Sequence, residues 1–431
     1  MPIKQFLQQV TSYIRSKEAR RYVEVELQQH IAHSKEAWMN KGYSAEEAEQ
    51  KAIAEMGSAS QLGKSMDKIH RPKWDFWLIG AVLLLVATSF VPILTIQHVQ
   101  FGKVMTSYLL ERKIIHIVVA IGLIIALVYM DYRKFQKFSM PIYVVAVFLL
   151  LLMLFMPNLR VNGEAMLKIG PLRIQVWTVL PILLVAFAGF FTEHKWKGWH
   201  LTGLFVVPLL LIMMIPNPAV ALFYIVVVAI LFSFSYFTRK QKRYVGFVSG
   251  GIALATLAYG IYAYYYLFAW YQKERIAAFL QPELHMDSSG FFILRLKSAL
   301  ANAGWFGSQT PIYFPEAYTD YALVQLIQTY GYVAGILVIG VILAIALRIL
   351  WMIRTMPQSF GKLLVLAAVT LYSCQSVYSI LMIVGLLPLA GIPLPFISYG
   401  FIPLVLNAFL IGLVLSVYRR KSYVGKQALS A

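Results

Sequence analysis

Residues 331–352 have the sequence Gly-Tyr-Val-Ala-Gly-Ile-Leu-Val-Ile-Gly-Val-Ile-Leu-Ala-Ile-Ala-Leu-Arg-Ile-Leu-Trp-Met, in which Arg348 is the single charged residue. A helix needs about 20 consecutive apolar residues to cross the hydrocarbon core of a bilayer. Similar apolar stretches recur along the chain, near residues 75–95, 113–130, 141–156, 175–191, 200–215, 218–237, 245–267, 331–352, 361–385 and 402–418. We therefore expect an all-α, polytopic membrane protein with about ten transmembrane helices in residues 73–421.

The composition supports this expectation. Of the 431 residues, 59% are hydrophobic and 13% are charged, whereas a soluble domain carries about 25% charged residues. A net charge of +19 would suggest nucleic-acid binding in a soluble protein. Here the basic residues gather at the ends of apolar stretches, which indicates orientation in a membrane and no nucleic-acid partner. Cys374 is the only cysteine, which excludes disulfides within the chain and cysteine-built metal sites.

Basic residues occupy every second linker between the expected helices. An excess of Lys and Arg marks cytoplasmic linkers, so we expect a multi-pass plasma-membrane protein with both termini in the cytoplasm. The basic residues in or next to these linkers, before the first span and after the last one are Arg71, Lys73, Arg133, Lys134, Lys137, Lys195, Lys197, Arg239, Lys240, Lys242, Arg243, Arg348, Arg354, Lys362, Arg419, Arg420 and Lys421. The opposite linkers follow the rule imperfectly, because two of them carry Arg112, Lys113, Arg160, Lys168 and Arg173.

Residues 1–72 differ from the rest of the chain, since they mix many acidic residues with basic ones. Their pattern predicts a helix over residues 16–39, ended by Gly42. Ser44 and Glu47 have the spacing of a capping box at the start of a second helix. Gly57 and Ser58 end that helix, and a short third helix follows. We expect a small, soluble, cytoplasmic helical domain here, and a cytoplasmic tail at residues 422–431.

One expected extracellular linker, residues 268–330, is far longer than an ordinary connection. It contains Pro315-Glu-Ala-Tyr-Thr-Asp320, directly before an apolar helix face formed by Ala322, Leu323, Leu326, Ile327 and Tyr330. Asp320 is interpreted in two ways. It is a helix cap or a partner of the helix dipole, or it is a base or metal ligand that faces a groove at the membrane surface.

A second candidate segment is Gly385-Leu-Leu-Pro-Leu-Ala-Gly-Ile-Pro-Leu-Pro-Phe-Ile-Ser-Tyr-Gly400. Its prolines and glycines exclude a regular helix. Irregular backbone at membrane depth is tolerated only where protein or a cavity covers it. The segment is therefore either a re-entrant structural loop or one wall of a polar cavity, with Ser398 and Tyr399 as hydrogen-bonding groups.

Two weaker patterns lie in or near the long linker. Glu283-x-His285-x-Asp287 would place three metal ligands on one side of an extended segment, although a solvated loop is the commoner reason for such a pattern. Aromatic residues also cluster where the linker begins, and they are typical of an interfacial belt, with sugar contact as the alternative. These residues are Tyr262, Tyr264, Tyr265, Tyr266, Trp270 and Tyr271.

Together these stretches resemble the SEDS family of cell-wall polymerases, the FtsW/RodA/SpoVE group. Residues 393–400 reproduce the family's late motif Pro-Leu-Pro-Phe-(Ile/Val)-Ser-Tyr-Gly. The run from Pro315 to Tyr321 is similar to the family's Pro-Glu-x-His-Thr-Asp-Phe. Asn162-Gly163 and Gln175 match two earlier family segments weakly, and Arg112 can be matched to a basic residue ahead of the second helix. The resemblance covers about residues 75–421.

The resemblance implies a peptidoglycan glycosyltransferase that polymerises lipid II, an undecaprenyl-diphosphate-linked disaccharide peptide, during division, elongation or sporulation. It implies a class B penicillin-binding protein as partner. It assigns catalysis to Asp320 and substrate binding to Arg112, Gln175, Ser398 and Tyr399. It names no metal ligand, and it leaves open a divalent cation near Asp320.

The sequence also departs from the family. Gln-Pro-Ser-Glu is Gln175-Val-Trp-Thr178 here, Pro181 replaces a lysine, Gln328-Thr329 replaces a pair of glutamates, and Phe401-Ile-Pro403 replaces Gly-Ser-Ser. Coordinated loss of charges is expected of a repurposed site and of a divergent active paralogue alike. Two alternatives to the polymerase therefore stay open. One is a flippase of lipid-linked precursors, because a broken helix suits a transporter, and the other is a catalytically inactive scaffold for a cell-wall synthesis partner.

The first 70 residues are similar to a small "permease prefix" helical domain that precedes some Gram-positive membrane proteins. The similarity is carried by Ser44-Ala-Glu-Glu-Ala-Glu-Gln-Lys-Ala and by Glu55-Met-Gly57-Ser. It names no activity.

Overall fold

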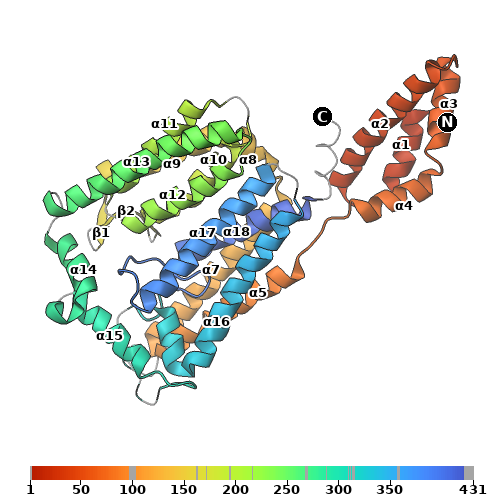
Figure 1. Cartoon of the computed structure of the whole chain (residues 1–431). Coiled ribbons are helices and arrows are strands. Elements are labelled where there is room, and N and C mark those ends of the chain that lie inside the picture. Colours follow the sequence, from red (N-terminus) through yellow and green to blue (C-terminus); the bar gives the residue numbers. More distant parts are fainter. Residues whose placement is uncertain are drawn as a thin grey trace. The chain divides into compact units, whose positions relative to one another are not determined.

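The computed structural model describes residues 2–96, 103–161, 164–170, 172–193, 196–215, 217–266, 270–287, 289–308, 310, 312, 316–356 and 360–421. The chain divides into two compact units, Met1–Asp75 with Tyr418–Ala431, and Phe76–Val417. Asn162, Gly163, Pro315 and residues 422–431, all singled out in the sequence, lie outside the described residues. The N-terminal part of the first unit is red to orange in Figure 1, and the second unit runs from orange to blue.

Residues 2–75 of the first unit contain four helices, α1 (Ile3–Ser12), α2 (Lys17–Met39), α3 (Ala45–Glu55) and α4 (Ala59–Ile69). Serine side chains start three of them: Ser16 accepts from the Ala19 N–H and Ser58 from the Gln61 N–H. Ser44 and Glu47 form the predicted capping box, so that prediction is confirmed. Helix α1 was not predicted.

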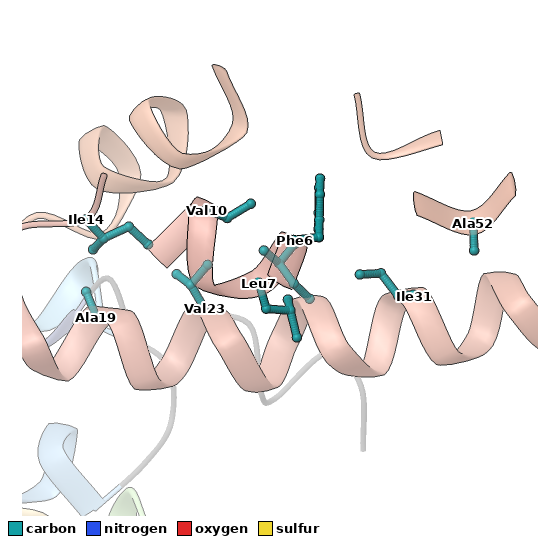
Figure 2. Close-up of a cluster of buried hydrophobic side chains, with 9 residues drawn as sticks. Phe6, Leu7, Val10, Ile14, Ala19, Val23, Ile31 and Ala52 are labelled. Atoms are coloured by element: carbon teal, nitrogen blue, oxygen red, sulfur yellow. The ribbon is translucent and has the colours of Figure 1, made fainter. Parts of the chain in front are cut away.

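The core of this unit lies between α1, α2 and α3. It consists of Phe6, Leu7, Val10, Ile14, Ala19, Val23, Leu27, Ile31 and Ala52 (Figure 2). Val23, Leu27 and Ile31 recur at helical spacing, so one stripe of α2 is buried by its neighbours. The unit thus has an apolar core of its own.

Asp67 joins the end of α4 to the start of α2. Its carboxylate accepts from the Arg15 N–H (2.9 Å) and from Arg71 (3.0 Å). These bonds, led by the one from Arg15, hold the pKa of Asp67 below its usual value. A lowered folded-state pKa stabilises the unit above the unfolded value of about 3.9, and that stabilisation is lost as the pH falls through the lower folded value.

We expect Asp67→Asn to destabilise the first unit by about 1–2 kcal/mol at neutral pH, because two hydrogen bonds to a charged acceptor are weakened. Hydrogen exchange at the α1–α2 junction of the full chain should accelerate accordingly. The difference between variant and wild type should shrink as the pH approaches 3 to 4. Glu36→Gln, at an exposed position of α2, should leave exchange unchanged, and equal exchange in both variants would contradict the role of Asp67.

The second unit is dominated by apolar helices. They are α5 (Phe76–Thr88), α6 (Val91–Ile96), α7 (Lys103–Tyr129), α8 (Arg133–Lys137), α9 (Ser139–Phe155), α10 (Leu180–Phe190), α11 (Gly198–Met214), α12 (Pro218–Ser233), α13 (Arg239–Tyr266), α14 (Trp270–Leu280), α15 (Ser289–Ala301), α16 (Ala322–Arg354), α17 (Phe360–Ile383) and α18 (Phe401–Arg419). The described residues of this unit also contain two short 3₁₀ helices, η1 (Val176–Val179) and η2 (Pro282–His285).

Five helical stretches in the described part are long and apolar enough to cross a bilayer, namely Phe76–Thr95, Thr106–Tyr129, Ala322–Arg354, Phe360–Ile383 and Phe401–Arg419. Shorter apolar helices are Ser139–Phe155, Val176–Phe190, Gly198–Met214 and Pro218–Ser233. These helices define a multi-pass membrane protein. Helix α17 lies at the centre of the unit, since 78% of its most apolar 18-residue stretch is buried. Helices α16, α12 and α10 pack around it (Figure 1).

The structure corrects three expectations. The fold is mostly helical, as expected, but β1 (Leu159–Val161), β2 (Glu164–Ile169) and β3 (Leu172–Ile174) form an antiparallel three-stranded sheet that was not expected. The segment from Glu283 to Asp287 is a 3₁₀ helix followed by a turn, so its acids do not line one side of a strand. Residues 322–328 are buried on all sides, whereas Tyr330 is exposed, so they do not form a single apolar face.

Candidate functional site

The long linker before α16 is folded. Helices α14 and α15 lie at the end of the bundle where α16 begins (Figure 1). From Glu316 to Tyr321 the chain makes a compact turn, in which the Glu316 carbonyl accepts from the N–H groups of Thr319 (3.0 Å) and Tyr321 (3.4 Å). Asp320 lies on this turn, directly before the first turn of α16, and its side chain is half-buried. The structure therefore places Asp320 on fixed backbone.

The late segment, residues 384–400, is irregular but buried from Ile392 to Ser398. Its backbone groups are satisfied by specific partners: Gln375 of α17 donates to the Pro393 carbonyl (2.7 Å), and the Leu394 N–H donates to Ser398 Oγ (2.8 Å). Tyr378 donates to the Pro388 carbonyl (3.1 Å). These bonds explain how a proline-broken segment is tolerated inside an apolar protein.

The two candidate segments meet. The Tyr399 N–H donates to the Tyr318 carbonyl (2.9 Å), and the rings of these tyrosines are 5.5 Å apart in an edge-to-face arrangement. Asp320 approaches the same segment, because a Cβ atom built on Gly391 would lie 3.5 Å from Asp320 Oδ2. Asp320, Tyr318, Gly391 and Tyr399 thus form one site, which we call the Asp320–Tyr399 site.

Both segments contain strained backbone. Glu316 has φ 58° and Phe396 has φ 62°, and they are the non-glycine residues with positive φ in the described part of the chain. A non-glycine residue in this region costs on the order of 1–3 kcal/mol and persists where surrounding structure enforces it. Such residues concentrate at functional sites, so their location supports a function for this site.

Helix α7 brings basic groups to the site. Lys113 is fully buried, and its Nζ donates to the Ser398 carbonyl (3.4 Å) and lies 6.0 Å from the Tyr399 ring centre. The His116 ring is 5.6 Å from the Tyr399 ring and 5.2 Å from Phe401. The exposed Arg112 guanidinium is close enough to Tyr399 for its charge to act on the phenol. A buried cation next to the Ser398 carbonyl and the Tyr399 ring gives this side of the site a positive charge, which suits an anionic ligand.

The predicted residues are only partly brought together. Asp320, Tyr399 and Arg112 surround one region, whereas the Ser398 hydroxyl is buried and occupied by the Leu394 N–H. The Gln175 side chain has other partners. It accepts a hydrogen bond from Trp177 Nε1 (2.5 Å), and its amide nitrogen lies 3.8 Å from Met166 Sδ. Lys113 and His116 were missed as site residues. Their signal is a pair of basic side chains, three residues apart, inside an apolar helix.

Positions that depart from the family pattern line an apolar pocket behind the late segment. Its walls come from η1, α10, α12, α17, the late segment and α18, and the lining residues are Trp177, Leu180, Pro181, Phe223, Leu371, Gln375, Ile392, Leu406 and Leu410. Trp177 and Pro181 stand at positions where the family pattern has polar side chains. They give the pocket apolar walls, and Gln375 and Ile392 line the same pocket.

No three His, Cys, Asp or Glu side chains of the described residues come together in a way that could hold a metal ion, either at Glu283–Asp287 or near Asp320. The chemistry available from the described residues at the Asp320–Tyr399 site is that of a carboxylate, a phenol and nearby cations.

The Gln328 side chain holds Ile312 in place, ahead of the Asp320 turn in the sequence. Its buried amide donates to the Ile312 carbonyl (3.1 Å) and accepts from the Ile312 N–H (2.7 Å). We expect Gln328→Met to lower the free energy of unfolding by about 2–4 kcal/mol, because both backbone groups of Ile312 lose their partner. Unfolding in detergent measures this. Gln281→Met, at an exposed position, should have little effect, and a similarly small effect of Gln328→Met would contradict the clamp.

The helical architecture and the Asp320–Tyr399 site define a SEDS-type membrane protein. The chain matches the FtsW/RodA/SpoVE cell cycle protein family over residues 76–423 and belongs to that family. It is 26% identical over 368 residues to the protein named "Probable peptidoglycan glycosyltransferase FtsW" of Trichlorobacter lovleyi, covering 80% of this chain and 93% of that protein. It is 23% identical over 381 residues to the peptidoglycan glycosyltransferase MrdB of Escherichia coli K12, covering 84% and 96% of the two chains.

Solved structures share the fold. A chain of a peptidoglycan synthase complex that coordinates polymerization and crosslinking superposes with a TM-score of 0.65 at 21% identity, covering 81% of this chain and 98% of that chain. The rod shape determining protein RodA of Thermus thermophilus gives a TM-score of 0.57 at 20% identity, covering 81% and 97%. At these identities the similarity establishes the fold alone.

Proposed function

We propose that this protein is a peptidoglycan glycosyltransferase that polymerises lipid II in cell-wall synthesis during division, elongation or sporulation. The observation that carries the proposal is the Asp320–Tyr399 site, in which the turn bearing Asp320 is bonded to the Pro393–Gly400 motif. Two named relatives, one FtsW and one MrdB, support the same activity.

In the proposed reaction, the Asp320 carboxylate takes the proton from a hydroxyl group of the acceptor sugar. The resulting oxygen nucleophile forms a bond to the anomeric carbon of the lipid-linked donor sugar. The bond between that carbon and the diphosphate oxygen breaks, and the diphosphate lipid leaves with the electron pair. Arg112 and Lys113 supply positive charge close to the site, which would stabilise the developing negative charge of the leaving group.

The proposal includes a topology. About ten spans would place both termini in the cytoplasm of a plasma-membrane protein and Asp320 on the outer face, where the cell wall is built. The first unit would be a soluble cytoplasmic domain. A class B penicillin-binding protein would be the partner that crosslinks the polymer.

The experiment uses the full-length protein, purified with a class B penicillin-binding protein and reconstituted in vesicles with labelled lipid II. Glycan polymer, separated by size, is the expected product. Movement of lipid II across the vesicle without polymer would instead support the flippase.

A second candidate function is supported by the apolar pocket. Trp177 and Pro181 stand where the family has a serine and a lysine, and they line the pocket beside the late segment. A site that has lost these polar groups suits a catalytically inactive scaffold that binds the same partner. Binding of the penicillin-binding protein without polymer or lipid movement would favour the scaffold.

A further inference from the structure

A tight turn with two exposed aromatic side chains follows α15. Trp305 is 66% exposed and Phe306 is 85% exposed. They are adjacent in sequence, and no charged residue occurs from Ser298 to Pro315. Loops that face water usually carry charged residues, so an uncharged stretch with two large exposed aromatic residues requires another explanation.

The turn is fixed to a break in α16. Gly331 has φ 85° and ψ 176°, which interrupts the helix. The Tyr332 N–H then donates to the Gly304 carbonyl (3.1 Å), the Val333 N–H to the Trp305 carbonyl (3.3 Å), and the Ser308 N–H to the Gln328 carbonyl (2.7 Å). The Trp305 and Tyr332 rings pack edge to face at 6.1 Å. The position of the turn along α16 is therefore determined by backbone bonds.

The burial of α16 changes at this position in the way expected at the edge of a bilayer. Before the break, residues 322–328 are buried in protein. After it, exposed apolar side chains continue to the far end of the helix: Val333, Ile336, Leu337, Leu343, Leu347, Leu350 and Trp351. At about 1.5 Å per residue, the stretch from Tyr330 to Trp351 spans about 30 Å, which equals the thickness of the hydrocarbon core. The break, and the turn bonded to it, would thus lie at one membrane–water interface.

We propose that Trp305 and Phe306 form an interfacial lipid anchor that inserts into the leaflet next to the Asp320–Tyr399 site. Tryptophan favours this region of a bilayer because it combines an apolar ring with a polar N–H group, and the adjacent Phe306 ring adds apolar surface for insertion. The anchor is bonded through the Ser308 N–H to the Gln328 carbonyl in the first part of α16, and α16 directly follows the turn that carries Asp320. It sets the depth at which Asp320 meets a membrane-bound substrate. The anchor itself does not depend on the proposed polymerase activity.

The anchor can be tested by site-specific labelling, because Cys374 is the single cysteine of the chain. In a Cys374→Ser background the chain has no cysteine, so Phe306→Cys can carry a single environment-sensitive fluorophore. The labelled full-length protein is reconstituted in vesicles that contain phospholipids spin-labelled either near the headgroup or near the chain end. Iodide in the buffer probes exposure to water. Leu343→Cys, on the exposed side of α16 and well past the break, is the matched deep control.

We expect the label at position 306 to be quenched most by the shallow spin label, less by the deep one and least by iodide. The label at position 343 should show the reverse order of the two spin labels. Strong iodide quenching at 306 without lipid quenching would overturn the proposal. Lipid quenching at 306 that disappears when the penicillin-binding protein is added would also overturn it, because the turn would then be a protein contact.

Discussion

Replacing Asp320 by asparagine is expected to reduce the rate of lipid II polymerisation by about 10²–10⁴-fold, the usual contribution of a general base. Asparagine keeps the size of the side chain and therefore the turn, but it cannot accept a proton. Asp320 is half-buried on a turn that is bonded to the late segment, so the loss should appear in the chemical step. Single-turnover polymerisation with labelled lipid II measures it.

Glu316→Gln is the matched control for this experiment. Glu316 is an exposed carboxylate on the same turn, and glutamine preserves its backbone conformation. The rate of lipid II polymerisation by Glu316→Gln should stay within a few-fold of the wild-type rate. Binding of lipid II should persist in Asp320→Asn, and undiminished polymerisation by that variant would contradict the assignment of Asp320 as the base.

Replacing Gly331 by alanine is expected to lower the free energy of unfolding by about 3–5 kcal/mol. Its combination of φ 85° and ψ 176° is accessible essentially to glycine alone, and an added Cβ would overlap the Trp305 carbonyl. The variant would therefore lose the helix break and the bonds between α16 and the turn at residues 304–308. The midpoint of thermal unfolding in detergent should fall sharply.

Gly340→Ala provides the comparison. Gly340 lies in the regular part of the same helix, and a Cβ there meets no atom within 4 Å. Because alanine has a higher helix propensity than glycine by about 1 kcal/mol, this variant should be unchanged or slightly more stable. Equal midpoints for the two variants would show that the break at Gly331 is not essential.

The sequence predicted those parts of the fold that depend on local rules. The helix over residues 16–39 and the capping box at Ser44 follow from spacing and side-chain chemistry, and both are present. The sheet at residues 159–174 was missed because Arg160, Lys168 and Arg173 were assigned to a linker by their charge. Helix α1 was missed because no side chain caps its start.

The site was predicted only in part, for a physical reason. Asp320 and Tyr399 were identified through motifs. The hydrogen bond that joins their segments, however, runs between two main-chain groups, and such a bond cannot be predicted from the identity of the side chains. Lys113 was interpreted as a topology signal, although its amine is buried against the Ser398 carbonyl. Gln175 matched a motif, but its partners are Trp177 and Met166.

The bond between Tyr399 and Tyr318 also has a consequence for biosynthesis. The two halves of the site lie on either side of α16 and α17 in the chain, so they leave the ribosome at different times. The turn at Asp320 remains without its backbone partner until the late segment has been synthesised, and closing so long a loop requires the intervening helices to be packed first. A nascent chain arrested before Tyr399 therefore cannot contain a completed site, and activity can begin only after the late segment has been translated.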